Sequence, residues 1–337
     1  MVTIKTIAQQ AGVSPSTVSI ILNGKAKERK ISPKTEKKVR DIIISTGYSP
    51  NVQAVGLRSI PKTFEYRIVI FWTADFRASM MTRFFSIIES KILDQNYSCE
   101  ILLKPYQNNF LASAMTDDLI RSCHGLIICN SSEKDLEFLE QNSFSRPIVL
   151  YNRYSNKYSA VTVNDRFIGS IPADVFFSHN RKNPVIIASK PTFNGMILRT
   201  NLFSYQCTEH HMELPPVCYG PATLTGGYQT TLKALEEYPN CDCIFFSSDT
   251  LAIGALRAFQ EKKRHIPQDL EFIAVGNHEL EQGEICYPSI SVMYIPIEEM
   301  AVQCLNLLYE QMTYRENTPQ SISLPVRYIP RESCPDA

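Results

Sequence analysis

The stretch IKTIAQQAGVSPSTVSIILN, residues 4 to 23, decides the fold of the N-terminal part of the chain. Ile4, Ile7, Ala8 and Ala11 recur at helical spacing, which predicts a first helix with one apolar stripe. Gly12 suits the left-handed backbone conformation that ends a helix without steric cost. A tight turn is therefore expected directly after this helix.

A second helix is expected to begin at Pro15, because Ser14 offers an N-cap oxygen and the missing N–H of proline is harmless in the first turn. Val18, Ile21 and Leu22 are expected to face inward. The outward face then carries Pro15, Ser16, Thr17, Ser19 and Ile20. Two short helices joined by a tight turn are typical of helix-turn-helix DNA readers, whose second helix meets base edges and phosphates. An ordinary helical hairpin is the alternative.

A third helix is predicted from about residue 33 to 46. Ser32 and Pro33 repeat the N-cap and first-turn pattern, and Val39, Ile42 and Ile43 supply an apolar stripe. Three helices can enclose a small core. The segment KAKERK, residues 25 to 30, forms a basic loop before this helix, where it is placed either to meet phosphate or simply to be solvated.

Charge is distributed unevenly along a chain that is formally neutral. Residues 1 to 65 contain 11 Lys or Arg and 4 acidic residues, which leaves a net charge of +7 there and −7 on the remainder. A basic head on an acidic body suits a polyanion-binding head, although exposed lysines on any small domain give a similar asymmetry.

The first 59 residues resemble the headpiece and hinge of the lactose-repressor/galactose-repressor (LacI/GalR) family of bacterial transcription factors. The resemblance lies in TIKTIAQQAGVSPSTVSIILNG (residues 3 to 24) and ISPKTEKKVRDIIISTGYSPNVQAVGLRS (residues 31 to 59). It implies that residues 50 to 59 form a hinge helix on operator DNA, with Leu57 as the apolar wedge in a minor-groove step and Ala54 beside it. A solvated linker is the alternative.

The predicted DNA-contacting residues come from the headpiece and the hinge: Thr3, Pro15, Ser16, Thr17, Ser19, Ile20, Asn23, Lys25, Lys27, Lys30, Asn51, Ala54 and Leu57. Two features depart from the family pattern. Ile20 stands where many relatives carry an Arg, which favours contact with a thymine methyl over hydrogen bonds to guanine. The loop from residue 23 to 31 is longer than in the lactose repressor. The operator sequence of a relative therefore cannot be assumed for this chain.

The rest of the chain alternates short apolar runs with helical stretches, which predicts an α/β architecture with parallel sheets. The expected strands are 67 to 72, 99 to 104, 125 to 130, 147 to 152, 183 to 189, 241 to 248 and 271 to 277. The expected helices are 81 to 95, 116 to 122, 168 to 178, 225 to 238 and 250 to 262, and the family resemblance implies one more at about 297 to 313. A single large sheet is one arrangement of these elements.

The family resemblance implies the other arrangement, two Rossmann-like lobes of the type I periplasmic binding protein kind. Weaker matches in the body appear in the family's order: PIVLYNR, SSDTLAIGALRAFQEKKRHIPQDLEFIAVGN and PSISVMYIPIEEMA. The expected domains are a helix-turn-helix headpiece (1–49), a hinge helix and linker (50–65), and an effector-binding and dimerisation domain (66–337). Within the last, the first lobe is expected at about 66–161 and 293–321, and the second at about 162–292 and 322–330.

Ligands of open parallel sheets bind beyond the carboxyl ends of the strands, so polar residues that follow strands are candidates for effector contact. The candidates are Asp75, Phe76, Asn130, Asn152, Arg153, Arg199, Ser248, Asp249 and His278. The resemblance supports Asp249 and Arg199. However, the usual G-F-D-D is G-N-H-E here, and the Gln that relatives carry before a proline is Ile295. These departures keep a phosphorylated sugar or a protein co-effector open beside a plain sugar.

No catalytic or metal-binding motif is expected. The ten cysteines include no C-x-x-C, and His210 and His211 have no spaced partner, so we expect neither a metal nor a cofactor. The common nucleotide-binding, hydrolase and metalloprotease motifs are absent. The N-terminus lacks an apolar signal core and no run of about 18 apolar residues occurs, which predicts a cytoplasmic protein without membrane contact.

These patterns, together with the family resemblance, predict a sequence-specific DNA-binding regulator and not an enzyme. We expect a homodimer that represses a carbohydrate-utilisation operon from a near-palindromic operator and responds to a sugar or sugar phosphate bound between the lobes. The alternative from another class is a cytoplasmic α/β sugar-processing or sugar-binding protein with an accessory basic head. A DNA-architectural protein, indifferent to sequence and metabolite, is a third hypothesis.

Overall fold

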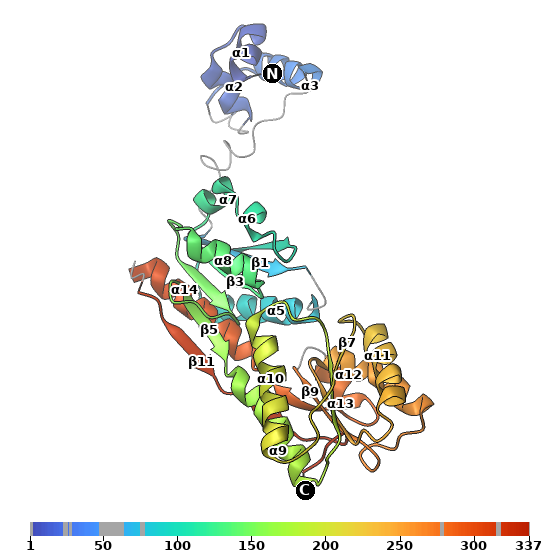
Figure 1. Ribbon diagram of the computed structural model, residues 1–337. Coiled ribbons are helices and arrows are strands. Elements are labelled where there is room, and N and C mark those ends of the chain that lie inside the picture. The colour runs from blue at the N-terminus through green and yellow to red at the C-terminus, as the bar shows by residue number, and fades with distance from the viewer. Residues whose placement is uncertain are drawn as a thin grey trace. The chain divides into compact units, whose positions relative to one another are not determined.

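The computed structural model describes residues 3–22, 26, 29–46, 64–74, 78–276, 280–314 and 318–336. The chain divides into two compact units, Met1–Glu65 and Tyr66–Ala337 (Figure 1). Each unit has its own hydrophobic core, so each is described by itself.

The N-terminal unit contains the three helices expected from the sequence, α1 (Ile4–Ala11), α2 (Pro15–Leu22) and α3 (Pro33–Thr46). Gly12 ends α1 with φ 68° and ψ 36°, the left-handed conformation that glycine adopts without strain. The Ser14 hydroxyl oxygen accepts a hydrogen bond from the Thr17 backbone N–H at 3.1 Å, which caps α2. Ser32 caps α3 in the same way through the Thr35 N–H at 3.2 Å.

The core of this unit is built from the apolar stripes of the three helices. The buried residues are Ile7, Ala8, Ala11, Val18, Ile21, Ala26 and Val39. Ile4, Leu22, Ile42 and Ile43 are partly buried against them. Ala8 is among the buried residues, and its small side chain lets α1 pack closely against the rest of this core.

The described residues of the second unit form two six-stranded sheets. The first has the order β11-β5-β4-β3-β1-β2, and all its strand pairs are parallel. Its strands are β1 (Tyr66–Thr73), β2 (Cys99–Tyr106), β3 (Gly125–Cys129), β4 (Ile148–Tyr151), β5 (Ser159–Val163) and β11 (Ser321–Leu324). The central strand β3 is buried along its whole length, as its uninterrupted apolar sequence requires for a strand covered on both faces.

The second sheet repeats this plan with the order β12-β10-β9-β8-β6-β7. Its strands are β6 (Pro184–Ala188), β7 (Val217–Tyr219), β8 (Cys243–Phe246), β9 (Glu271–Val275), β10 (Ser291–Tyr294) and β12 (Arg327–Ile329). Only the β10–β12 pair is antiparallel among the strand pairs that the structure describes. The expected α/β class is confirmed, and so are the two Rossmann-like lobes that the family resemblance implied.

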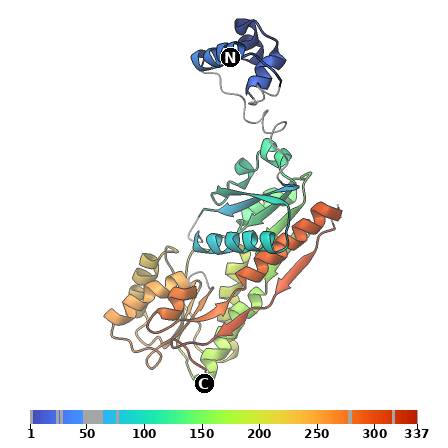
Figure 2. The same ribbon diagram turned by 180° about the vertical axis from the view of Figure 1, so that it is seen from behind.

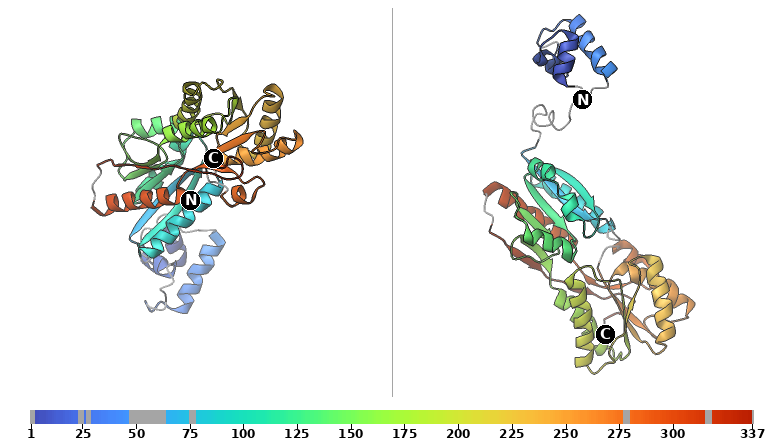
Figure 3. Two further views of the ribbon diagram at one scale, coloured as in Figure 1. Left: turned by 90° about the horizontal axis from the view of Figure 1, so that it is seen from below. Right: turned by 45° about the horizontal axis from the view of Figure 1, so that its top comes forward.

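Helices cover both sheets. The other helices in the described part of the chain are α5 (Ala78–Asp94), α6 (Leu111–Ala114), α7 (Asp117–Ser122), α8 (Glu133–Gln141), α9 (Asp165–Ser178), α10 (Asn194–Glu209), α11 (Leu224–Glu237), α12 (Asp249–Glu261), α13 (Leu280–Ile285) and α14 (Ile297–Tyr314). The cyan helix α5 and the red helix α14 run side by side on one face of the first sheet (Figure 2). Helices α11 and α12 lie side by side on the second lobe (Figure 3), and α9 packs against α10.

Each of the three crossings between the lobes lies slightly later in the chain than the boundaries expected from the sequence. Strand β5 continues to Val163 in the first sheet, β10 continues to Tyr294 in the second, and β11 continues to Leu324 in the first. The assignment of residues 322 to 330 to the second lobe is therefore wrong for 322 to 324. The reason is that β11 pairs with β5 along its whole length, from Ser321 opposite Ala160 to Leu324 opposite Val163.

Candidate functional site

The outward face of α2 is the first candidate site. Pro15 and Ser16 are exposed, and Thr17, Ser19 and Ile20 are partly exposed, whereas Val18 and Ile21 are buried. The capping bond from Ser14 fixes where this helix begins and therefore which side chains project outward. This face carries small polar groups and one branched apolar side chain, which can approach base edges in a groove.

Two further predicted DNA contacts are exposed but already have local structural roles. The Thr3 hydroxyl caps α1 by accepting a hydrogen bond from the Thr6 N–H at 3.3 Å. Lys30 is exposed and adopts a positive φ of 52° in the turn before α3. The predicted contacts Asn23, Lys25, Lys27, Asn51, Ala54 and Leu57 lie outside the described residues, as do the effector candidates Asp75, Phe76 and His278.

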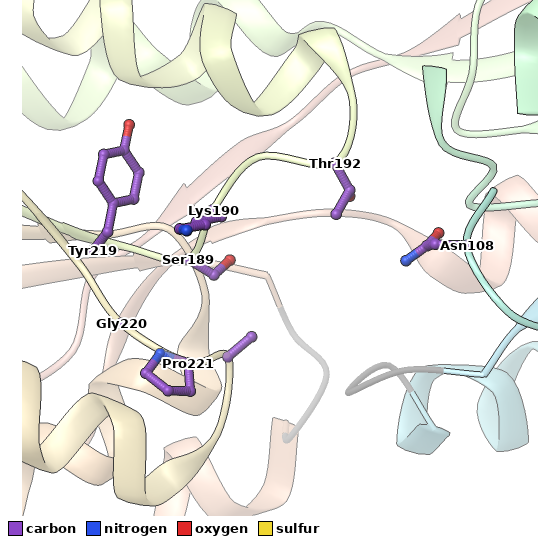
Figure 4. A pocket seen from close by; sticks show the side chains of 8 residues that line it. Asn108, Ser189, Lys190, Thr192, Tyr219, Gly220 and Pro221 are labelled. Carbon is purple, nitrogen blue, oxygen red and sulfur yellow. The ribbon is translucent and has the colours of Figure 1, made fainter. Parts of the chain in front are cut away.

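The second candidate site is a cavity of about 460 Å³ between the two lobes of the body. Its lining residues are Asn108, Ser189, Lys190, Thr192, Tyr219, Gly220, Pro221 and Ala222. Asn108 follows β2 of the first sheet. In the second sheet Tyr219 ends β7, and the other lining residues follow β6 or β7. Figure 4 shows Asn108 on the side of the cavity opposite Lys190 and Tyr219. The cavity thus combines polar groups from both lobes with one half-exposed aromatic ring.

A neighbouring cavity of about 470 Å³ is lined by two predicted effector residues and by Asp165, the ion-pair partner of a third, Arg199. Asn152 and Arg153 line it at the carboxyl end of β4, together with Asp165 and Phe193. Arg153 is buried, and its guanidinium carbon lies 3.6 Å from the centroid of the Phe193 ring. Its Nε donates to the Ser131 carbonyl oxygen, and its Nη1 donates to the Asn152 carbonyl oxygen at 2.5 Å.

Arg199 approaches the same aromatic ring from the second lobe. Its side chain is 10% exposed and pairs with Asp165, with both Nε and Nη2 at 2.7 Å from Oδ1. Its guanidinium carbon lies 5.7 Å from the Phe193 centroid. The Phe193 ring therefore lies near two buried cations, a geometry in which the π face stabilises positive charge.

A direct polar contact joins the lobes beside this cavity. The carboxylate of Glu133, at the start of α8, accepts hydrogen bonds from the Asn194 backbone N–H at 2.7 Å and from its side-chain amide at 2.9 Å. Asn194 is the first residue of α10 in the second lobe. Because both oxygens of the carboxylate are used, this contact favours one separation of the lobes at this point.

The remaining candidates lie at strand ends as expected but outside the linings of these two cavities. Asn130 is buried after β3 with φ 58°, and its carbonyl oxygen accepts a hydrogen bond from the Thr73 hydroxyl at 3.0 Å. Ser248 caps α12 through the Leu251 N–H at 3.4 Å. Asp249 is buried as the first residue of α12. Ser248 therefore has a structural role as the N-cap of α12.

Sequence reasoning missed the residues that line the first cavity. Ser189 and Lys190 follow β6, Tyr219 ends β7, and Asn108 comes two residues after β2. The rule that selected the other candidates, polar residues at the carboxyl ends of parallel strands, applies to these positions as well. The edge strand β7 was not predicted, which removed Tyr219 from consideration.

Two buried cysteines of the second lobe, Cys207 and Cys241, are not activated nucleophiles. Burial raises the pKa of the Cys207 and Cys241 thiols to about 12, so both are protonated at neutral pH.

A membrane-spanning segment needs a long helix that is apolar throughout, and none of the helices that the structure describes meets this requirement.

Both parts of the chain match known protein families. A family model described as bacterial regulatory proteins, lacI family, matches residues 3–51, and a model of a periplasmic binding protein-like domain matches residues 173–334. The transcriptional repressor PurR of Pasteurella multocida is 25% identical over 340 residues, covering 99% of this chain and 98% of that protein. Catabolite control protein A of Priestia megaterium is 24% identical over 346 residues, covering 98% and 99%.

Solved structures share the fold along most of the chain. A LacI family transcription regulator from Clostridium acetobutylicum is 28% identical with a TM-score of 0.73, covering 79% of this chain and all of that one. The regulator CelR in complex with cellobiose is 18% identical with a TM-score of 0.70, covering 99% and 100%. The lac repressor dimer bound to operator and the anti-inducer ONPF is 18% identical with a TM-score of 0.71, covering 99% of each chain.

The helix-turn-helix unit, the two doubly wound lobes and the full-length relatives agree with one another and with the resemblance found in the sequence. The chain is a DNA-binding transcriptional regulator that combines a lacI-family DNA-binding domain with a periplasmic binding protein-like domain and is similar along its whole length to repressors of the LacI family.

Proposed function

We propose that this regulator represses a carbohydrate-utilisation operon and that a sugar or sugar phosphate controls it from the cavity between the lobes. It acts in the cytoplasm as a homodimer on a near-palindromic operator, since a two-fold symmetric reader requires symmetric half-sites. The lac repressor dimer on its operator and CelR with cellobiose, which share the fold, support this assignment.

The observation that carries the proposal is the composition of the 460 Å³ cavity. Asn108, Ser189, Thr192 and Tyr219 offer amide, hydroxyl and aromatic groups, the combination that a hydroxyl-rich ring requires. Lys190 adds a positive charge, which favours an effector that carries a phosphate or carboxylate.

The proposed function includes no catalytic step. The effector is bound and released unchanged, and it acts by stabilising one arrangement of the lobes relative to the other. A search for turnover of the bound sugar by the full-length protein tests this part, and conversion of the ligand at a rate above background contradicts it.

The operator-binding part is tested by selection of duplexes from a randomised pool with the full-length protein. We expect a near-palindromic consensus. Ile20→Arg should shift one position in each half-site toward guanine, because a guanidinium can pair with guanine O6 and N7 whereas isoleucine cannot. Gln10→Arg, which adds the same charge at an exposed position of α1, is the matched control and should leave the consensus unchanged. No enriched consensus with wild-type protein contradicts the proposal.

The effector part is tested by thermal-shift screening of sugars and sugar phosphates, followed by calorimetry. For any ligand found, Tyr219→Ala should weaken its binding while operator affinity without effector stays the same, because Tyr219 is 53% exposed and its removal leaves the core intact. Tyr219→Phe separates the contribution of the ring from that of the hydroxyl. Unchanged ligand affinity in Tyr219→Ala assigns the effector to another site.

A further inference from the structure

Three side chains that commonly bind metals meet in the second lobe, away from the candidate effector cavities. His179 follows α9, Glu271 is the first residue of β9, and Cys334 lies in the segment after β12. The His179 Nδ1 atom lies 2.9 Å from Glu271 Oε2 and 3.8 Å from Cys334 Sγ. Cys334 Sγ lies 3.6 Å from Glu271 Oε2.

These separations match the edges of a zinc coordination tetrahedron. With metal–ligand distances of about 2.0 Å for nitrogen and oxygen and about 2.3 Å for sulfur, tetrahedral geometry places nitrogen and oxygen about 3.3 Å apart. The same geometry places sulfur about 3.5 Å from either of them. The observed triangle of 2.9, 3.6 and 3.8 Å differs from this by a few tenths of an ångström, which side-chain rotation can absorb.

The surroundings hold the ligands in place and still admit an ion. Glu271 is buried, and its other oxygen, Oε1, lies 3.2 Å from the guanidinium of Arg181, which leaves Oε2 directed at His179 and Cys334. Such a partner on the second oxygen orients a metal-binding carboxylate. Cys334 is fully buried, whereas the His179 side chain keeps 10% exposure, so the cluster lies just below the surface.

The segment that carries Cys334 is fixed to the lobe by backbone contacts that do not depend on a metal. The Ser333 N–H donates to the Ser289 carbonyl oxygen at 2.9 Å, and the Phe272 N–H donates to the Ser333 carbonyl oxygen at 3.0 Å. The Cys334 thiol is therefore presented to Glu271 by the fold itself. Since binding needs no rearrangement of the backbone, its entropic cost is small.

We propose that His179, Glu271 and Cys334 bind one zinc ion, which joins the end of α9, the start of β9 and the C-terminal segment of the second lobe. A thiolate, an imidazole and a carboxylate are together typical of zinc, and a water completes the fourth position. No spacing motif in the sequence indicates the site, because its members are 92 and 63 residues apart. For this reason no metal was expected from the sequence.

The metal-free alternative is a hydrogen-bonded network of His179, Glu271 and Arg181. Burial raises the pKa of the Cys334 thiol to about 12, so without a metal ion the thiol is protonated and donates a weak hydrogen bond to Glu271 Oε2 at 3.6 Å. Zinc binding releases this proton to solvent and forms the zinc–sulfur bond. The two alternatives therefore differ in what the sulfur does.

The test uses full-length protein stripped with a chelator and then titrated with zinc or cobalt(II) alone. We expect one zinc per chain by elemental analysis, a rise in the unfolding temperature of the body, and a sulfur-to-cobalt charge-transfer band. Cys334→Ser should abolish the band and lower zinc affinity at least tenfold, since loss of even a supporting partner costs about 10- to 100-fold. Cys286→Ser, a partly exposed cysteine elsewhere in the lobe, is the matched control and should retain the band.

Zinc uptake by wild-type protein no greater than by Cys334→Ser overturns the proposal, as does a cobalt spectrum without the charge-transfer band. His179→Gln provides a second variant near the surface, where misfolding is not expected. If it binds zinc as the wild type does, His179 is not a ligand and the site as proposed is wrong.

Discussion

The turn at Gly12 gives the sharpest test of how the DNA-binding unit is specified. Gly12 has φ 68° and ψ 36°, and its N–H donates to the Gln9 carbonyl oxygen at 3.3 Å. A Cβ atom placed there meets no atom within 4 Å. Replacement by alanine therefore introduces no clash, and its whole effect is conformational.

The magnitude follows from two opposing terms. An L-residue in the left-handed conformation costs about 1 to 2 kcal/mol. Alanine also has less conformational freedom than glycine in the unfolded chain, which stabilises the folded state by about 0.4 to 1 kcal/mol. We therefore expect Gly12→Ala to destabilise the N-terminal unit by about 1 kcal/mol, which raises the equilibrium constant for its opening roughly fivefold.

Amide hydrogen exchange in the full-length protein is the appropriate assay, because a chain with two compact units need not unfold in one step. Amides of α1 and α2 should exchange about fivefold faster in Gly12→Ala, and amides of the second unit should be unaffected. Gly12→Asn should cost only a few tenths of a kcal/mol, since asparagine tolerates the left-handed conformation.

Gly283→Ala is the matched control, because that glycine has no positive φ and its added Cβ meets only Ile290 at 3.9 Å. It should leave exchange in the N-terminal unit unchanged. Equal exchange rates in Gly12→Ala and wild type refute the assignment of strain to this turn. Equal acceleration by alanine and asparagine refutes the left-handed conformation as its cause.

Three further predictions concern other parts of the molecule. Asp165→Ala should lower the free energy of unfolding of the body by about 3 kcal/mol in denaturant titration, because it leaves the Arg199 guanidinium, 10% exposed, without its counter-charge; Asp165→Asn should cost less. Phe203→Ala should cost about 3 to 5 kcal/mol in the same titration, because this buried ring stacks on Phe245 at 4.7 Å. Lys30→Gln should reduce the slope of log operator affinity against log salt by about 1 without altering the selected consensus; an unchanged slope removes Lys30 from the phosphate contacts.

Much of the fold could be predicted from local sequence because its central elements are strongly patterned. The apolar run at residues 125 to 130 became β3, and the stripe from residue 33 to 46 became α3. Strand β7 was not predicted, because three residues with partial burial give no apolar run. Helix α8 was also missed, since EKDLEFLEQ is mostly polar and its start depends on the capping of Ser132.

The cavity was harder to predict than the fold, since it depends on which strand ends lie opposite one another. Asn108 and Lys190 are separated by 82 positions in the chain, and nothing in either local sequence indicates that they line one cavity. The same applies to His179, Glu271 and Cys334, whose proximity arises only when α9, β9 and the C-terminal segment pack together. Periodicity reports burial within one element, whereas these sites depend on the order of strands in the sheets.

The strand order also bears on how an effector can act on DNA binding. A ligand shifts a conformational equilibrium only by the difference in its affinity for the two states, so a ligand held by one rigid lobe has no effect on the separation of the lobes. The 460 Å³ cavity takes Asn108 from the end of β2 in one sheet and Ser189 and Tyr219 from β6 and β7 in the other. A ligand there gains or loses contacts as the lobes move, while the Glu133–Asn194 contact favours one separation even when the cavity is empty. Because the contact and the cavity bias the same motion, the response to effector is set by the difference between their two free energies and not by effector affinity alone.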